Sequence, residues 1–126
     1  CGIQAMSPLT SAMLNVVDYE HVRQKRMENM KVLHEVLAPV NEISLTEFRP
    51  ALYYPFLYSS DTLRKELIQK KIYVPQLWSE TAENPDSSTW EQYLSNCICP
   101  LPVDQRYDAE DMREIGRQVL TLIGKL

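Results

Sequence analysis

The sequence predicts an α+β fold, in which a small antiparallel or mixed sheet of three to four strands packs against helices. Segments with the apolar period of helices alternate with short apolar segments that contain proline, and the 126 residues include eight prolines but only three glycines. A chain of this length is typical of one domain, expected here over residues 1–126. We expect residues 18–126 to form its core, and residues 1–17 to be a helical segment that links to or contacts a partner domain.

Two helices are expected near the N-terminus. Ser7 followed by Pro8 is typical of a helix start, because serine caps the first turn and proline fits its first position. Asp18 is expected to cap a second, long helix that ends near Leu37, because Pro39 cannot continue a helix.

Four segments have the composition of short strands. Apolar residues alternate over residues 41–48, and aromatic residues dominate residues 51–58. Pro55 has no N–H for a ladder, so we expect it at a sheet edge or a bulge. Residues 72–77 and 98–103 are two further extended segments, each constrained by proline.

Two short helices are expected between these strands. Ser59 or Ser60 caps the first, which ends near Lys70 and has the apolar stripe Leu63, Leu67 and Ile68. Residues 89–96 form the second. The polar residues 79–88 between them are predicted to be a loop.

The last helix has the clearest pattern. Asp108 is expected to cap it, and Asp111 completes a variant of the capping box. The apolar stripe of this helix is Met112, Ile115, Val119, Leu122, Ile123 and Leu126.

The composition excludes several classes of function. A net charge of −4 and a pI of about 5.2 disfavour a broad surface for nucleic acid. The longest apolar runs are far shorter than the roughly 20 residues of a membrane helix. Glycine-rich phosphate loops and dinucleotide fingerprints do not occur. We therefore expect neither nucleic acid nor a membrane as a partner.

The cysteines and histidines do not predict a metal site. Cys1, Cys97 and Cys99 are an odd number in a chain that opens without a signal-peptide pattern, which indicates a cytoplasmic protein. Cys97 and Cys99 are separated by one residue rather than the two of zinc sites, and we expect both to pack as small apolar residues. His21 and His34 share one predicted helix but lie roughly 20 Å apart along it.

Two clusters are candidates for a ligand-binding cleft. Tyr53–Phe56 and Tyr73–Trp78 place aromatic residues beside prolines at predicted strand ends, and Leu101–Tyr107 follows the last strand. Such ends stop pairing and direct side chains outward, where they line clefts. The alternative, and the more common arrangement, is an aromatic rim of the core.

Several short motifs occur in an order that resembles a known family. The most specific is Cys99–Tyr107, followed by Glu110–Met112. The others are less specific but agree in order and spacing: Asp18–Glu20, Arg23, Arg26, Asn29, Tyr54–Phe56, Leu63–Arg64, Lys71–Pro75 and Leu77–Trp78. Together they cover nearly the whole chain. They resemble the C-terminal small domain of fold-type I pyridoxal-phosphate aminotransferases, especially the sugar aminotransferase-like group DegT/DnrJ/EryC1/StrS.

The resemblance implies a small domain that closes over a large one. In such enzymes the large domain holds the Schiff-base lysine and most cofactor ligands, and the small domain supplies substrate-side contacts. The implied function is amino transfer to a keto or keto-sugar substrate by the whole protein, with this chain alone not catalytic. The residues expected on the substrate side are Tyr54, Gln76, Trp78 and Arg106.

We expect pyridoxal phosphate in the full-length enzyme and no cofactor bound by this chain. An imine-forming lysine needs apolar surroundings, whereas the lysines here lie in exposed helical contexts: Lys25, Lys31, Lys65, Lys70, Lys71 and Lys125. Many sugar aminotransferases carry a histidine-containing motif after the strand that matches residues 72–77. Trp78 stands near that place here, so the resemblance does not extend to specificity for nucleotide sugars.

Two functions stay open. The chain is the small domain of an aminotransferase-like protein, whose partner is a large cofactor-binding domain on the same or a separate chain, or it is a standalone, non-catalytic binding or interaction domain of the same fold. The coding sequence upstream of Cys1 separates them. We expect a homodimer, and the chain without a large domain is expected to associate through residues 3–17, which are apolar and uncharged.

Overall fold

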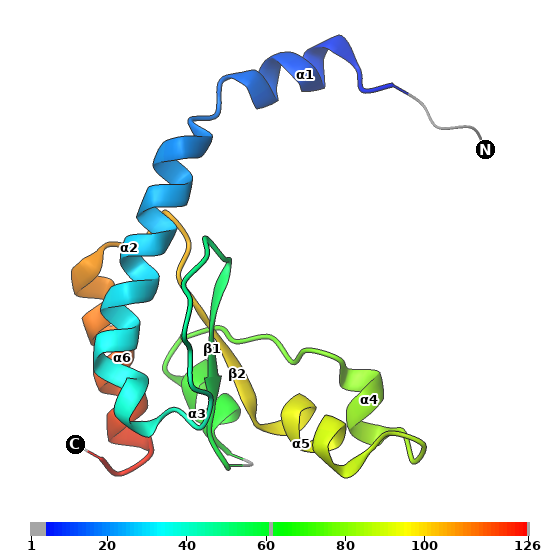
Figure 1. The fold of residues 1–126 in the computed structure, drawn as a ribbon, viewed down its shortest axis with the longest axis vertical. Coiled ribbons are helices and arrows are strands. Elements are labelled where there is room, and N and C mark those ends of the chain that lie inside the picture. The colour runs from blue at the N-terminus through cyan, green and yellow to red at the C-terminus, as the bar shows by residue number, and fades with distance from the viewer. Residues whose placement is uncertain (1–4, 61, 126) are drawn as a thin grey trace.

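A computed structural model describes residues 5–60 and 62–125, and this part of the chain has an α+β fold (Figure 1). It contains six α-helices and a two-stranded antiparallel sheet. The elements in chain order are α1 (Pro8–Asn15), α2 (Tyr19–Leu37), the 3-10 turn η1 (Ala38–Val40), β1 (Tyr53–Leu57), α3 (Leu63–Gln69), α4 (Ser79–Glu83), α5 (Thr89–Cys97), β2 (Ile98–Pro102) and α6 (Ala109–Leu122).

Three helix starts confirm the predicted caps. Ser7 caps α1 and Asp18 caps α2, each by accepting a hydrogen bond from a backbone N–H of the first turn. Asp108 and Asp111 form the capping box of α6. For α3, the N-cap is Thr62 rather than the predicted Ser59 or Ser60, and its side chain makes no cap bond; the Ser60 hydroxyl, two residues earlier, accepts from the backbone N–H of Leu63 at 3.2 Å. These local bonds satisfy N–H groups that a helix start otherwise leaves without partners.

Prolines occupy matched positions in the two strands. Pro55 lies opposite Pro100, and Tyr53 lies opposite Pro102. Antiparallel pairs alternate between hydrogen-bonded and non-hydrogen-bonded positions, and a proline fits only the latter because it lacks an N–H. The strand pairing is therefore compatible with all three prolines, and Pro55 lies on an edge strand, as predicted.

The sheet has two strands in the described residues rather than the predicted three to four. Residues 41–48 and 72–77 are loops. On the outer edge of β1, the Asn41 side chain donates to the carbonyl of Pro55 at 3.0 Å and accepts from the N–H of Leu57 at 3.0 Å. This side chain takes the backbone groups that a third strand would need.

The outer edge of β2 is closed in a different way. Pro100 and Pro102 have no N–H, and the N–H of Ile98 is bonded to the carbonyl of Leu94 in α5. Arg64 donates to the carbonyl of Ile98 at 2.7 Å. A fourth strand would find few backbone groups on this edge with which to pair.

Two other expectations differ from the structure. Residues 79–88 include the short helix α4 rather than only a loop. Ile68 is exposed, so the buried stripe of α3 consists of Leu63 and Leu67.

The cysteines at the junction of α5 and β2 are buried as predicted. Cys97 ends α5 and Cys99 lies in β2.

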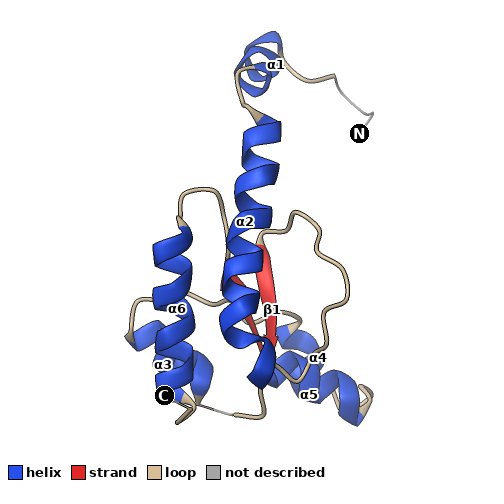
Figure 2. Cartoon of the chain, turned by 60° about the vertical axis from the view of Figure 1, so that its left-hand side comes forward, coloured by secondary structure: helices blue, strands red, loops and turns tan. Residues whose placement is uncertain are grey.

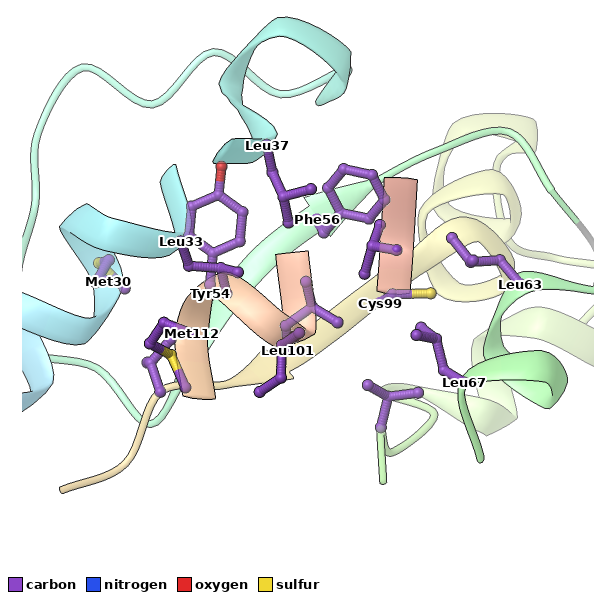
Figure 3. Close-up of a cluster of buried hydrophobic side chains, with 14 residues drawn as sticks. Met30, Leu33, Leu37, Tyr54, Phe56, Leu63, Leu67, Cys99, Leu101 and Met112 are labelled. Carbon is purple, nitrogen blue, oxygen red and sulfur yellow. The ribbon is translucent and has the colours of Figure 1, made fainter. Parts of the chain in front are cut away.

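The core lies between the sheet and the helices α2, α3 and α6 (Figure 3). Its largest fully buried side chains include Leu33, Leu37, Tyr54, Phe56 and Leu101. The α6 stripe is confirmed at Met112, Ile115 and Val119, which are buried, and at Leu122 and Ile123, which are half-buried; Leu126 lies outside the described residues.

The helix α1 stands away from this core. It lies at the free end of α2 in both views (Figures 1 and 2), and none of its residues is buried. The first fully buried residue of the described chain is Asn29, halfway along α2. The N-terminal part of the chain therefore projects beyond the packed domain.

Candidate binding site

An open pocket of about 700 Å³ lies beside the strand ends. Its walls come from the start of β1, the turn after α3, the loop after β2 and the first turns of α6. The polar lining comprises three cations, three carboxylates, three tyrosines and one amide: Lys70, Lys71, Arg106, Asp104, Asp111, Glu114, Tyr53, Tyr73, Tyr107 and Gln118. We call it the cationic pocket, after its three cations.

Arg106 is held at this pocket by Asp104. The guanidinium donates through Nε to Oδ1 at 2.9 Å and through Nη2 to Oδ2 at 2.8 Å, and it lies over the Tyr107 ring at 5.9 Å from the centroid. The Asp104 side chain is 9% exposed and that of Arg106 is 77% exposed. Two of the five guanidinium N–H groups are thus used, and three remain for a ligand.

The pair stays charged. Hydrogen bonds from the Arg106 side chain hold the pKa of the Asp104 carboxyl below its ordinary value, against the opposite effect of burial. The same bonds raise the pKa of Arg106. Asp104 therefore orients the cation.

The loop that carries Arg106 is anchored to α2. The Asn29 amide, which is 1% exposed, donates to the carbonyls of Asp104 at 2.9 Å and Tyr107 at 3.0 Å. Arg26 donates through Nε to the Gln105 side chain at 3.0 Å. Asn29 and Arg26 together fix this loop to α2.

The lysines enter the pocket from the end of α3. Lys71 adopts φ 67°, and its N–H bonds to the carbonyl of Ile68 at 2.9 Å, while that of Ile72 bonds to Leu67 at 2.9 Å. This is the Schellman arrangement, in which glycine usually takes the left-handed position. A lysine at this position places a positive charge at the pocket wall.

Within the described residues, the pocket charges without an ion pair are those of Lys70 and Lys71, which are positive, and that of Asp111, which is negative. Asp111 accepts from the backbone of Asp108, and Glu114 bonds to Arg117 and Gln118. Asp104 is paired with Arg106. The pocket is therefore suited to binding an anionic group, with three tyrosines available to contact the rest of a ligand.

The structure does not bring the four predicted substrate-side residues together. Only Arg106 lines the cationic pocket. Tyr54 is fully buried in the core, and Gln76 is exposed in the loop after α3. Trp78, 56% exposed, borders a second hollow, and Tyr53 lines both hollows.

That second hollow is an apolar groove of about 400 Å³. Pro55, Ile98 and Pro100 form its floor, on the sheet face opposite the buried Tyr54 and Phe56. The side chains around this floor include Leu45, Ala51, Leu77 and Trp78. We call it the proline groove.

The sequence analysis missed a polar network at Tyr54. The Asn41 amide donates to the Tyr54 hydroxyl at 3.1 Å, and Nδ1 of His34 lies 3.0 Å from the same oxygen. The His34 ring also packs edge-on against Phe48. In the sequence, the only indication of this network is that two polar residues, His34 and Asn41, lie near the end of the predicted long helix, and this indication is weak.

The residues of this chain do not fit a cofactor or metal site. Five of the six lysines are exposed and Lys25 is half-buried, so none is enclosed by apolar side chains as an imine-forming lysine requires. Burial raises the pKa of Cys99 to about 11, which keeps its thiol protonated. The described residues contain no group of three potential metal ligands.

Two comparisons with known proteins identified no relative of this chain. Models of known protein families do not match the chain, and neither do curated proteins. Among the described residues, no helix combines the length and apolarity that crossing a membrane requires.

Proposed function

We propose that this chain is the small domain of a pyridoxal-phosphate-dependent aminotransferase-like protein, and that its cationic pocket binds the anionic part of the keto substrate. The observation that carries the proposal is the fixed Arg106. It belongs to the most specific motif of the resemblance. Asp104 and the ring of Tyr107 contact its guanidinium, and Asn29 fixes the loop that carries it. A charged donor held in place in advance costs little entropy when a ligand binds.

The proposal assigns binding and orientation to this chain and the cofactor to a large domain. No lysine here suits the cofactor, so a partner on the same or a separate chain must supply it. The proposed location is the cytoplasm, in accord with an odd number of cysteines in the sequence.

The test uses the full-length product of the gene that encodes this chain. Arg106→Ala should raise the KM for an anionic keto substrate by roughly 10–100-fold, since hydrogen bonds to charged groups contribute about 1.5–3 kcal/mol, with a smaller change in kcat. Arg113→Ala, on the exposed side of α6, is the matched control and should leave KM unchanged. Equal KM values for the two variants would refute the role of Arg106. A full-length protein without a cofactor-binding lysine would refute the aminotransferase assignment.

The second candidate is a standalone binding domain that binds an anion in the cationic pocket without a large domain. Calorimetric titration of the chain with a small dicarboxylate separates the two. Two results together would favour this candidate. The chain would bind the dicarboxylate saturably and lose this binding on Arg106→Ala, and its gene would encode no large domain.

A further inference from the structure

The first observation is an apolar segment without a partner. We define the N-terminal arm as residues 5–17; every residue in it is exposed, and it carries no charged side chain. Met6, Leu9, Met13 and Val16 are 57%, 72%, 66% and 85% exposed. Their spacing of three, four and three residues puts those in α1 on one helix face, the pattern by which a helix fills an apolar groove.

The second observation is the proline groove. Its only charged lining residues, Glu47 and Arg49, pair with each other at 3.3 Å. An uncharged apolar helix is therefore a better match for the groove than a charged ligand, because it leaves no charge without a partner on either side.

Trp78 is held at the edge of this groove in a strained conformation. Its φ of 52° and ψ of 48° are left-handed, which costs a non-glycine residue about 1 kcal/mol or more. The buried Ser95 hydroxyl lies 2.7 Å from the Trp78 carbonyl and 2.9 Å from that of Leu77, and fixes this turn. A large aromatic side chain kept exposed in this way is typical of an interface anchor.

The helix α1 of a chain does not reach the Met30 side of its own groove when it folds back along α2. On α2, the groove contacts Met30, which is about 17 Å along the helix from Tyr19. The helix α1 has eight residues and a length of about 12 Å, so it would end short of Met30. The α1 of a second copy is not limited by this reach and can lie along the whole groove.

We propose that the stripe Leu9, Met13 and Val16 of one copy packs in the proline groove of a second copy, against Trp78, and that the exchange is reciprocal. A twofold axis relates two such contacts and closes the dimer. The contact requires neither cofactor nor substrate, and it names the residues that form the interface of the expected homodimer. In a longer protein, a large domain that precedes the arm would then lie next to the partner copy.

The first test is sedimentation of the 126-residue chain and matched variants at micromolar concentration. Leu9→Glu should abolish the dimer, whereas Ser11→Glu, which puts the same charge on the opposite face of α1, should keep it. Trp78→Ala should abolish it, whereas Trp90→Ala, which removes the other exposed tryptophan, should not. Thermal unfolding of each variant checks that the fold is retained. A monomeric wild type, or a dimer that tolerates Trp78→Ala, would overturn the proposal.

The second test mixes the two defective chains. Trp78→Ala retains an intact arm and Leu9→Glu retains an intact groove, so their mixture should form a heterodimer with one good contact although neither associates alone. If arms paired with arms instead, Trp78→Ala would dimerise by itself and the mixture would contain no heterodimer, and this outcome would overturn the groove as the docking site. The KM test of Arg106 is independent of this result, so the two proposals fail separately.

Discussion

Two asparagines organise this molecule through the carbonyls and N–H groups they bind. Asn29 binds carbonyls of the loop after β2 and thereby positions Arg106, and Asn41 takes the outer edge of β1. Asn29 belongs to a motif of the resemblance, but nothing local in the sequence indicates what its amide binds, because the partners lie more than 70 positions away.

Acidification should destabilise the chain through Asp104. Its pKa is lower in the folded than in the unfolded chain, so the ionised carboxylate stabilises the fold fully above the ordinary value of about 4. This contribution is lost as the pH falls through the folded-state pKa. Asp104→Asn should therefore cost about 1–2 kcal/mol at pH 7 and much less near pH 3, as measured by urea unfolding. Glu47→Gln, in an exposed pair, is the control and should show no such difference.

Removing the Tyr54 hydroxyl should leave a half-buried ring nitrogen without a partner. The Asn41 amide donates to this hydroxyl, and we expect the hydroxyl to donate its own proton to Nδ1 of His34. Tyr54→Phe should cost about 1–2 kcal/mol of unfolding free energy, and ¹⁵N NMR should show His34 protonated on Nε2 in the wild type. Tyr58→Phe is the control, since the Tyr58 hydroxyl makes no hydrogen bond within the described residues. Equal costs for the two variants would contradict this assignment.

At the scale of elements, α3 and α6 end in the same way with different residues. Both helices end in a Schellman arrangement, with Gly124 at φ 67° after α6 and Lys71 at φ 67° after α3. The left-handed position strains a lysine but not a glycine.

Lys71→Gly should therefore stabilise the isolated chain by about 0.5–1 kcal/mol in denaturant titration. The same change should weaken anion binding, because it removes a cation from the pocket. Lys70→Gly, at a residue with negative φ, is the control and should not stabilise. A destabilised Lys71→Gly would mean that its side chain makes contacts that outweigh the strain.

The packing of α2 on α6 depends on Gly116. A Cβ atom there would lie 2.6 Å from Cγ1 of Val36, and a branched side chain on a helix has little freedom to move away. Gly116→Ala should cost about 1–3 kcal/mol despite the higher helix propensity of alanine. In the background of Val36→Ala the same substitution should cost less, which a double-mutant cycle measures. Additive costs would show that the two residues do not clash.

For the whole molecule, the closed sheet edges limit how it associates. Asn41 covers the edge of β1, and prolines remove N–H groups from that of β2, so we expect partners to bind through side-chain surfaces rather than by adding a strand. The exposed arm and the two hollows are the surfaces available for this.

The isolated chain should not form a specific aldimine with pyridoxal phosphate. None of its lysines is enclosed by apolar side chains. Titration with the cofactor, borohydride reduction and peptide mapping should give scattered labelling, well below one equivalent, of exposed lysines. Stoichiometric labelling of a single lysine would contradict this prediction.

The sequence alone determined the helix starts at Ser7, Asp18 and Asp108, the stripe of α6 and two of the three proline-containing strands that it predicts. These features depend on residues a few positions apart. The residue types that cap a helix and the apolar period of its buried face can therefore be recognised in the sequence. Tertiary structure decided the number of strands and the composition of the binding site. Both depend on groups distant in sequence: the side chain of Asn41 against β1, and Asn29 and Lys71 around Arg106. Long-range pairing of this kind leaves no local period, so only the folded chain shows that Arg106 faces a pocket and that Tyr54 does not.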